Sequence, residues 1–191
     1  MKSSEAIIHL ASARVCVQDD NYRRYQSLKQ PFRNLAAVND ETLAAGTSVS
    51  HRAPIVIIPL VGDVVTDRRI SPGQIQIITN PTITNPYNEE LVNYLVIGLE
   101  GETAVADFEM VNNNIQSPAP NIWLGKFDGR KDAVHKLSEG AYGVFVFVIE
   151  GVFEVQDRLL HSRDALELWK IDEVEFEALS NEAIILLIEV N

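Results

Sequence analysis

The amino-acid sequence predicts an all-β protein that folds into two small barrels in tandem. Short runs rich in Val, Ile and Phe alternate with turns that contain Gly and Pro, which is typical of β-sandwiches and barrels. A motif near the middle of the chain returns about 90 residues later, so the repeating unit has the size of a small domain. Helix signals are weak, and only Asn88–Tyr94 and Lys131–Leu137 indicate short helical turns.

Five stretches carry the strand prediction, starting with a short apolar strand at Ala6–Leu10 that we expect to pair with one of the barrels. Ile55–Leu60 and Ala183–Ile188 are continuous apolar runs. Gln74–Ile77 and Glu173–Glu177 alternate polar and apolar residues with a period of two. Such alternation favours antiparallel strands with one face in water and one in the core.

The repeat shares three landmarks between residues 55–77 and 144–168: a strand-ending glycine, an Asp-Arg pair, and a serine two residues before Gly or Asp. These are Gly62, Asp67-Arg68 and Ser71 in the first half, and Gly151, Asp157-Arg158 and Ser162 in the second. Each half is therefore interpreted as a hairpin, a tight turn and a strand. We predict a first barrel over residues 1–112 and a second over 121–191. The polar, proline-containing residues 113–120 would link them.

Composition excludes several classes of protein. With 46% hydrophobic residues the chain is not disordered, and no apolar run reaches the roughly 18 residues that span a bilayer. No signal peptide is recognised and there is one cysteine, so we expect a reduced, cytoplasmic protein. The net charge of −11 disfavours direct nucleic-acid binding. The acidic residues gather in 150–191, which predicts a solvated strand face, with a docking surface for a basic partner as the alternative.

Four stretches, in order, resemble the pirin family of the cupin superfamily. They are Asn39–Gly46, Pro72–Gln76, Asn85–Leu95, and Phe145–Val190 with its Leu-x-x-Trp pattern. The resemblance covers the chain from about residue 30 onward and implies a bicupin, two tandem cupin barrels of the double-stranded β-helix or jelly-roll kind. It also implies that the N-terminal strand crosses to the other domain.

The resemblance further implies one iron or similar ion in the first barrel, held by His-x-His and His-x-Glu. In this chain only His51 is available for the first pair, because Val49 stands two residues earlier, and Asn85 and Tyr87 occupy the second pair. A catalytic metal site normally keeps at least three protein ligands. We therefore predict no tightly bound metal. The alternative is one divalent transition ion, such as Fe, Ni, Cu or Zn, near His51.

The general cupin glutamate is also replaced, by Ile55 in the first repeat and Val144 in the second. His51, Asn85 and Tyr87 are nevertheless candidates for a ligand pocket, because an amide and a hydroxyl can bind a small polar molecule. Two other interpretations stay open. Asn85 and Tyr87 are also typical of a turn at Asn-Pro, and His51 of a polar residue at a barrel mouth.

Other residue types point to structure. His9, His135 and His161 are expected at the surface or in loops, and Cys16 between two valines as an inert buried thiol. Aromatic residues of the second half are expected to fill its barrel: Phe145, Phe147, Phe153, Trp169 and Phe176. No nucleophile-elbow, phosphate-loop or dinucleotide motif occurs.

The sequence thus favours a pirin-like bicupin that has lost most metal ligands, a non-catalytic module that binds a small molecule or a protein. The alternative is a metal-dependent oxidoreductase, a quercetin 2,3-dioxygenase of the kind some pirins are, because the resemblance implies that activity. A role as a transcription cofactor, as for eukaryotic pirin, is a third hypothesis. Open strand edges also admit a homodimer.

Overall fold

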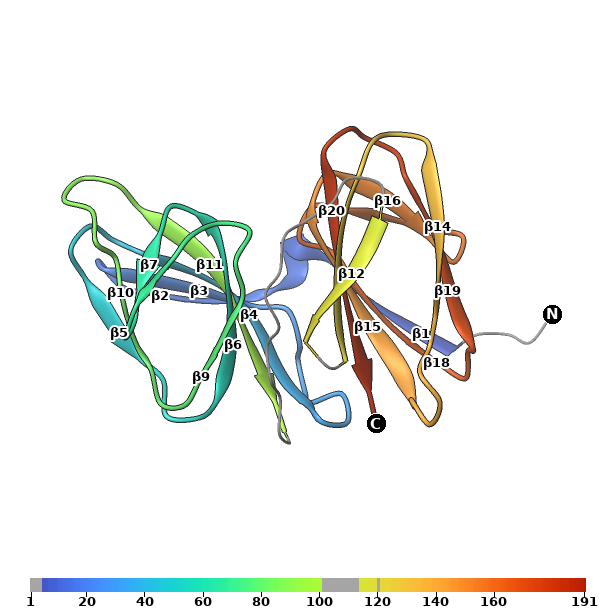
Figure 1. Ribbon diagram of the computed structural model, residues 1–191, viewed down its shortest axis with the longest axis horizontal. Helices are drawn as coiled ribbons and strands as arrows, with labels where there is room; N and C mark the ends of the chain where they lie inside the picture. Colours follow the sequence, from blue (N-terminus) through green and yellow to red (C-terminus); the bar gives the residue numbers. More distant parts are fainter. Residues whose placement is uncertain (1–4, 101–113, 120) are drawn as a thin grey trace. The chain divides into compact units, whose positions relative to one another are not determined.

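The computed structural model describes residues 5–100, 114–119 and 121–191, and its regular structure is almost all β-strand (Figure 1). The one helical element in these ranges is a 3₁₀ turn, η1 (Ala11–Ala13). None of the described segments is a helix long and apolar enough to cross a membrane. The prediction of an all-β jelly-roll fold is confirmed.

Two compact units make up the described chain. One unit contains the described residues of Arg14–Glu109, and the other those of Met1–Ala13 and Met110–Asn191. The boundaries therefore differ from the predicted division at residues 112 and 121. The first strand, β1 (Glu5–His9), pairs with β18 (Ala165–Trp169) of the later unit. The expected crossing of the N-terminal strand is thus present in the structure.

The unit of Arg14–Glu109, called here the N-terminal barrel, has a six-stranded and a four-stranded antiparallel sheet. The six-stranded sheet has the order β2 (Val15–Gln18), β3 (Tyr22–Gln26), β4 (Leu35–Leu43), β11 (Val92–Leu99), β6 (Ile55–Val61), β9 (Gln76–Ile78). The four-stranded sheet has the order β5 (Ser48–Ser50), β10 (Thr82–Thr84), β7 (Val64–Val65), β8 (Arg69–Ile70). The core contains Leu43 and Ile57 of the first sheet and Val64 and Ile83 of the second, so it lies between the two sheets.

The other unit, called here the C-terminal barrel, repeats this arrangement. Its six-stranded sheet has the order β1, β18, β15 (Gly143–Glu150), β20 (Ala183–Val190), β13 (Ile122–Phe127), β12 (Asn114–Ala119). Its four-stranded sheet has the order β14 (Lys131–Lys136), β19 (Glu173–Ala178), β16 (Val152–Val155), β17 (Arg158–His161). Edge-to-face contacts among Phe127, Phe153 and Phe176 fill the core between the sheets.

Period-two alternation decides the faces of these strands, as β19 shows. Val174, Phe176 and Ala178 are buried, whereas Glu173 and Glu175 are exposed, as the sequence predicted. Both helix predictions are wrong. Lys131–Leu137 is mostly strand β14, and Asn88–Tyr94 is a loop that enters β11.

The predicted linker 113–120 is also wrong over its described residues. Asn114–Ala119 form β12, which pairs with β13. Residues 113 and 120 lie outside the described ranges. Ile115 packs against the C-terminal core. A polar edge strand is held by main-chain hydrogen bonds, so its side-chain pattern did not reveal it.

The strand-ending glycines of the repeat have a steric cause. Gly151 has a φ of +81°, and a Cβ there would lie 2.5 Å from Ser180 Oγ and 2.7 Å from Ala183 Cβ. Gly62 has a φ of +71°, and a Cβ there would lie 3.0 Å from Val92 and 3.1 Å from Tyr87. Only glycine combines this backbone conformation with so close an approach.

Gly151→Ala is expected to lower the free energy of unfolding by about 2–4 kcal/mol, because overpacking adds to the cost of a left-handed alanine. Gly140→Ala is the matched control in the same barrel, since Gly140 has a φ of +87° and no atom within 4 Å of its built Cβ. The control should lose only about 1 kcal/mol. Denaturant unfolding followed by circular dichroism measures both values. Equal losses would contradict the steric argument.

Candidate functional site

Asn85, a predicted pocket residue, is buried and holds a turn together. Its amide nitrogen donates to the main-chain oxygens of Leu43 and Ala44, both at 3.1 Å, and of Glu90 at 2.8 Å. Its Oδ1 accepts a hydrogen bond from the Tyr87 amide at 2.9 Å. Both the donors and the acceptor of the side chain are therefore engaged by the main chain, which favours the turn interpretation.

Tyr87 is engaged in a similar way. Its hydroxyl oxygen accepts a hydrogen bond from the Asp63 amide at 3.0 Å, and its ring packs against the N-terminal core. The ring also covers Gly62, at the end of the hairpin. Tyr87 therefore closes the Gly62–Asp63 turn, and its contacts are those of a structural residue.

His51 is the predicted pocket residue that meets another chemically active group. Its Nε2 lies 3.2 Å from Oε2 of Glu41, whose side chain has no exposed surface. The His51 amide bonds to the Pro81 carbonyl at 2.9 Å, which continues the line of β5. Val49, two residues earlier, packs against the core, so His51 is placed on the inner face of the barrel. Glu41 was not among the residues predicted from the sequence to form the pocket.

Glu41 lies at the centre of a polar cluster on the inner wall. In the register of the sheet it stands directly opposite Tyr94 of β11 on one side and Arg24 of β3 on the other. Tyr22, two residues before Arg24, packs against the same core. Directly opposed side chains have Cβ atoms about 5 Å apart. We call these five residues, Tyr22, Arg24, Glu41, His51 and Tyr94, the Glu41 cluster.

The Glu41 cluster contains buried polar atoms without hydrogen-bonding partners. Both carboxylate oxygens of Glu41, the Tyr94 hydroxyl, Arg24 Nε and His51 Nε2 meet no group with hydrogen-bond geometry in the described residues. The neighbouring Asp40, on the opposite face of β4, accepts bonds from Arg14 at 3.1 Å and Asn93 at 2.6 Å. Because proteins pair nearly all buried polar groups, a concentration of unpaired ones points to a functional site.

The phenol groups of the cluster stay protonated at neutral pH. Burial raises the pKa of Tyr94, and the charge of Glu41 raises it further. Burial and then Glu41 raise the pKa of Tyr22 above its ordinary value, although nearby Arg24 opposes the shift. Both residues are therefore hydrogen-bond donors rather than phenolate ligands.

The cluster does not fit the transition metal that the resemblance implies. No group of three or more His, Cys, Asp or Glu side chains in the described parts of the chain is placed to hold an ion. One imidazole, one carboxylate and two protonated phenols fall short of the usual three ligands. Ile55 and Val144, at the positions of the cupin glutamate, pack into the barrel cores.

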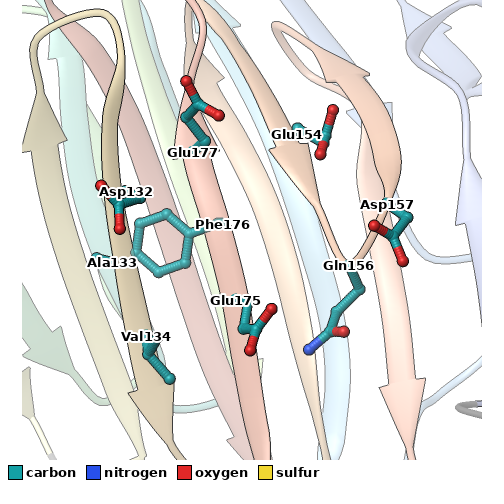
Figure 2. Close-up of a pocket in the computed structure, with 9 residues that line it drawn as sticks. All are labelled: Asp132, Ala133, Val134, Glu154, Gln156, Asp157, Glu175, Phe176 and Glu177. Atoms are coloured by element: carbon teal, nitrogen blue, oxygen red, sulfur yellow. The ribbon is translucent and has the colours of Figure 1, made fainter. Parts of the chain in front are cut away.

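An acidic groove of about 340 Å³ runs over the outer face of β14, β19 and β16 (Figure 2). Five carboxylates line it: Asp132, Glu154, Asp157, Glu175 and Glu177. Glu177 stands directly opposite Asp132 on one side and Glu154 on the other. Like charges in opposed positions destabilise a sheet, and water and salt screen them on an open face.

A second buried histidine pair lies inside the C-terminal barrel. His135 Nε2 is 2.9 Å from Oε1 of Glu189, which also accepts a bond from the Ser138 amide at 3.0 Å. The His135 and Trp123 ring centroids are 4.6 Å apart. The expectation of a surface His135 is wrong, because its carboxylate partner stands 54 positions away in the sequence.

Three other single-residue predictions have different outcomes. The nearly buried side chain of His9 bonds to Glu167 at 2.7 Å, so its surface placement is wrong. His161 is exposed, as predicted. Cys16 is exposed rather than buried, because all four residues of edge strand β2 are exposed.

Glu189 gives a pH dependence. Burial raises its pKa, but hydrogen bonds from His135 and Ser138 lower it more, and the net pKa falls below the ordinary value of 4.5. A carboxyl group whose pKa is depressed by folding stabilises the protein above its unfolded pKa and loses this effect as the pH falls. Glu189→Gln is thus expected to cost about 1–3 kcal/mol at neutral pH. Its deficit should shrink in acid.

Unfolding at a series of pH values measures this loss, and Glu139→Gln, at an exposed site, is the control. A Glu189→Gln deficit that stayed constant from neutral pH to below pH 4.5 would contradict the assignment.

Glu41 and Asp40 should respond to neutralisation with opposite signs. Glu41→Gln is expected to raise the free energy of unfolding by about 1 kcal/mol, because an amide costs less to bury than an unpaired carboxylate. Asp40→Asn should lower it by about 1–3 kcal/mol, because Asp40 accepts bonds from Arg14 and Asn93. Denaturant titration of both variants is the measurement. A similar loss in both would show that Glu41 is satisfied in the protein.

Residues 115–190 match the family model of the quercetinase C-terminal cupin domain. No curated protein sequence matches.

Among solved structures, YhhW from Escherichia coli aligns with a TM-score of 0.81 at 15% identity, covering 98% of both chains. The bacterial pirin YhhW in complex with nickel(II), also from Escherichia coli, gives 0.80 at 15% identity, covering 97% of this chain and 99% of the other. Quercetin 2,3-dioxygenase from Acinetobacter baumannii gives 0.66 at 14% identity, covering 98% and 87%. At these identities the likenesses concern the fold. Residues 115–190 of the C-terminal barrel therefore match the quercetinase C-terminal cupin domain, and the chain as a whole has the fold of the bacterial pirin structures.

Proposed function

We propose that this protein is a non-catalytic binding module whose N-terminal barrel receives a small molecule at the Glu41 cluster. The observation that carries the proposal is the set of buried, unpaired polar atoms around Glu41. They lie inside a barrel whose expected metal-ligand positions have other roles. Asn85 and Tyr87 hold turns, and only His51 contributes to the cluster.

The barrel has an apolar core that does not require an ion. Leu43, Ile57, Val92 and Val96 are buried on the six-stranded sheet, and Ile83 is buried on the four-stranded sheet. Hydrophobic burial of this kind stabilises a fold without a metal. The barrel can therefore fold without metal ligands and still serve as a scaffold for a binding site.

The second candidate is a metal-dependent dioxygenase of the quercetinase kind, which the likeness to the Acinetobacter baumannii enzyme brings forward. Such a reaction needs a metal to activate dioxygen or orient the substrate. The donor set of the Glu41 cluster does not fit that ion. The acidic face of the C-terminal barrel supports a different alternative, a basic protein partner, which we keep as secondary.

The deciding experiment is elemental analysis of protein purified without a metal-affinity tag, together with oxygen uptake in the presence of quercetin. We expect well below one transition-metal ion per chain and no quercetin-dependent uptake, with or without added Fe, Ni, Cu or Zn. His51→Ala should leave both readings unchanged. Near-stoichiometric metal that His51→Ala removes, or metal-dependent turnover, would establish the enzyme instead.

A further inference from the structure

Arg24 and Glu41 carry opposite charges, stand directly opposite each other, and still form no ion pair. Neighbouring strands β3 and β4 place them in register. Their side chains share the inner face, since Tyr22 on β3 and Leu43 on β4 belong to the same core. Arg24 Nε and both Glu41 oxygens are buried without hydrogen-bonding partners in the described residues. These atoms therefore receive no direct hydrogen bond from the described residues, although His51 Nε2 lies 3.2 Å from Oε2 of Glu41.

The neighbouring positions on this inner wall are polar as well. Gln26 and Asn39 form the next register pair that faces inward, and both are half-buried. The Tyr22 and Tyr94 phenols flank Glu41 as protonated donors, since the pKa of each is raised. Donors and acceptors therefore lie together on one patch, as in a site for a polar ligand with more than one functional group.

The charges select the class of ligand. A bare cation would meet Glu41 but leave Arg24 uncompensated, and a simple anion would meet Arg24 but be repelled by buried Glu41. A ligand with both signs satisfies both groups. Opposed residues have Cβ atoms about 5 Å apart, so the two ligand charges must lie a few bonds from each other.

We propose that the N-terminal barrel binds a small zwitterion of the α-amino acid class. The ligand ammonium group donates hydrogen bonds to Glu41, and the ligand carboxylate accepts them from Arg24. Tyr22, close to both charged residues, donates to the ligand carboxylate. His51 follows β5 of the four-stranded sheet, and its Nε2, at 3.2 Å from Oε2 of Glu41, positions the Glu41 carboxylate. This inference rests on the proposed function, since it names the ligand of that same site.

The test is calorimetric titration of the full chain with each of the twenty standard L-amino acids. For the tightest one, the decarboxylated amine and the deaminated acid serve as matched half-ligands. We expect each half-ligand to bind at least tenfold more weakly, because it loses a charge-assisted contact. Half-ligands that bind as tightly as the amino acid would overturn the proposal, as would the absence of binding by every amino acid at millimolar concentration.

Variants assign the two contacts. Glu41→Gln should weaken amino-acid binding at least tenfold while sparing the deaminated acid, and Arg24→Gln should do so while sparing the amine. Arg24→Lys keeps the charge and should retain part of the affinity even if Arg24→Gln fails to fold. Arg23→Gln, on the outer face of the same strand, is the control and should bind normally. Affinity unchanged in both Glu41→Gln and Arg24→Gln would place the ligand elsewhere and refute the proposal.

The inference and the proposed function fail in different ways. A stoichiometric metal in the purified protein would refute the proposed function. Metal-free protein that binds no amino acid would refute only the inference.

Discussion

Burying an ionised carboxylate is costly unless hydrogen-bond donors replace its water. The N-terminal barrel nevertheless keeps Glu41 fully buried, with neither oxygen in hydrogen-bond geometry with a described residue. A hydrophobic residue of similar size would fill the same place on β4 without that cost. Sites that break a packing rule in this way are expected where function requires them, and this is the reason for placing the proposed binding site at Glu41.

The barrel fold of this protein does not require the residues of the implied metal site, because the two depend on different side chains. The fold rests on the inward-facing apolar residues of both sheets and on the glycines that end the first strand of each repeat, Gly62 and Gly151. The implied metal site would have depended on a few side chains near the barrel mouth. Val49, Asn85 and Tyr87 stand at those positions in this chain, and the last two hold turns by hydrogen bonds.

The strand faces and the two-barrel organisation could be predicted from the sequence, because alternation and repeat length encode them. Side chains whose partners lie far away in the sequence could not be placed. The acids of β19 and the inward Phe176 were predicted from period two and confirmed. Strand β14 was predicted as a helical turn, because most of its residues are polar and the sequence does not show that His135 points inward. Glu41 was missed because it follows Asp40 in a polar run. Only the strand register, which puts the two acids on opposite faces, separates a paired carboxylate from an unpaired one.

The two barrels place a buried Glu-His pair in different surroundings, and this difference bears on function. In the C-terminal barrel one oxygen of Glu189 receives bonds from both His135 and the Ser138 amide, and only the other oxygen is without a partner. In the N-terminal barrel both oxygens of Glu41 lack such bonds, and the nearby guanidinium of Arg24 does not supply them. Satisfied polar groups rigidify a core, whereas unsatisfied ones of both signs gain most from an added ligand. The same pair of residue types therefore stabilises the core of one barrel, whereas in the other barrel it belongs to the proposed binding site.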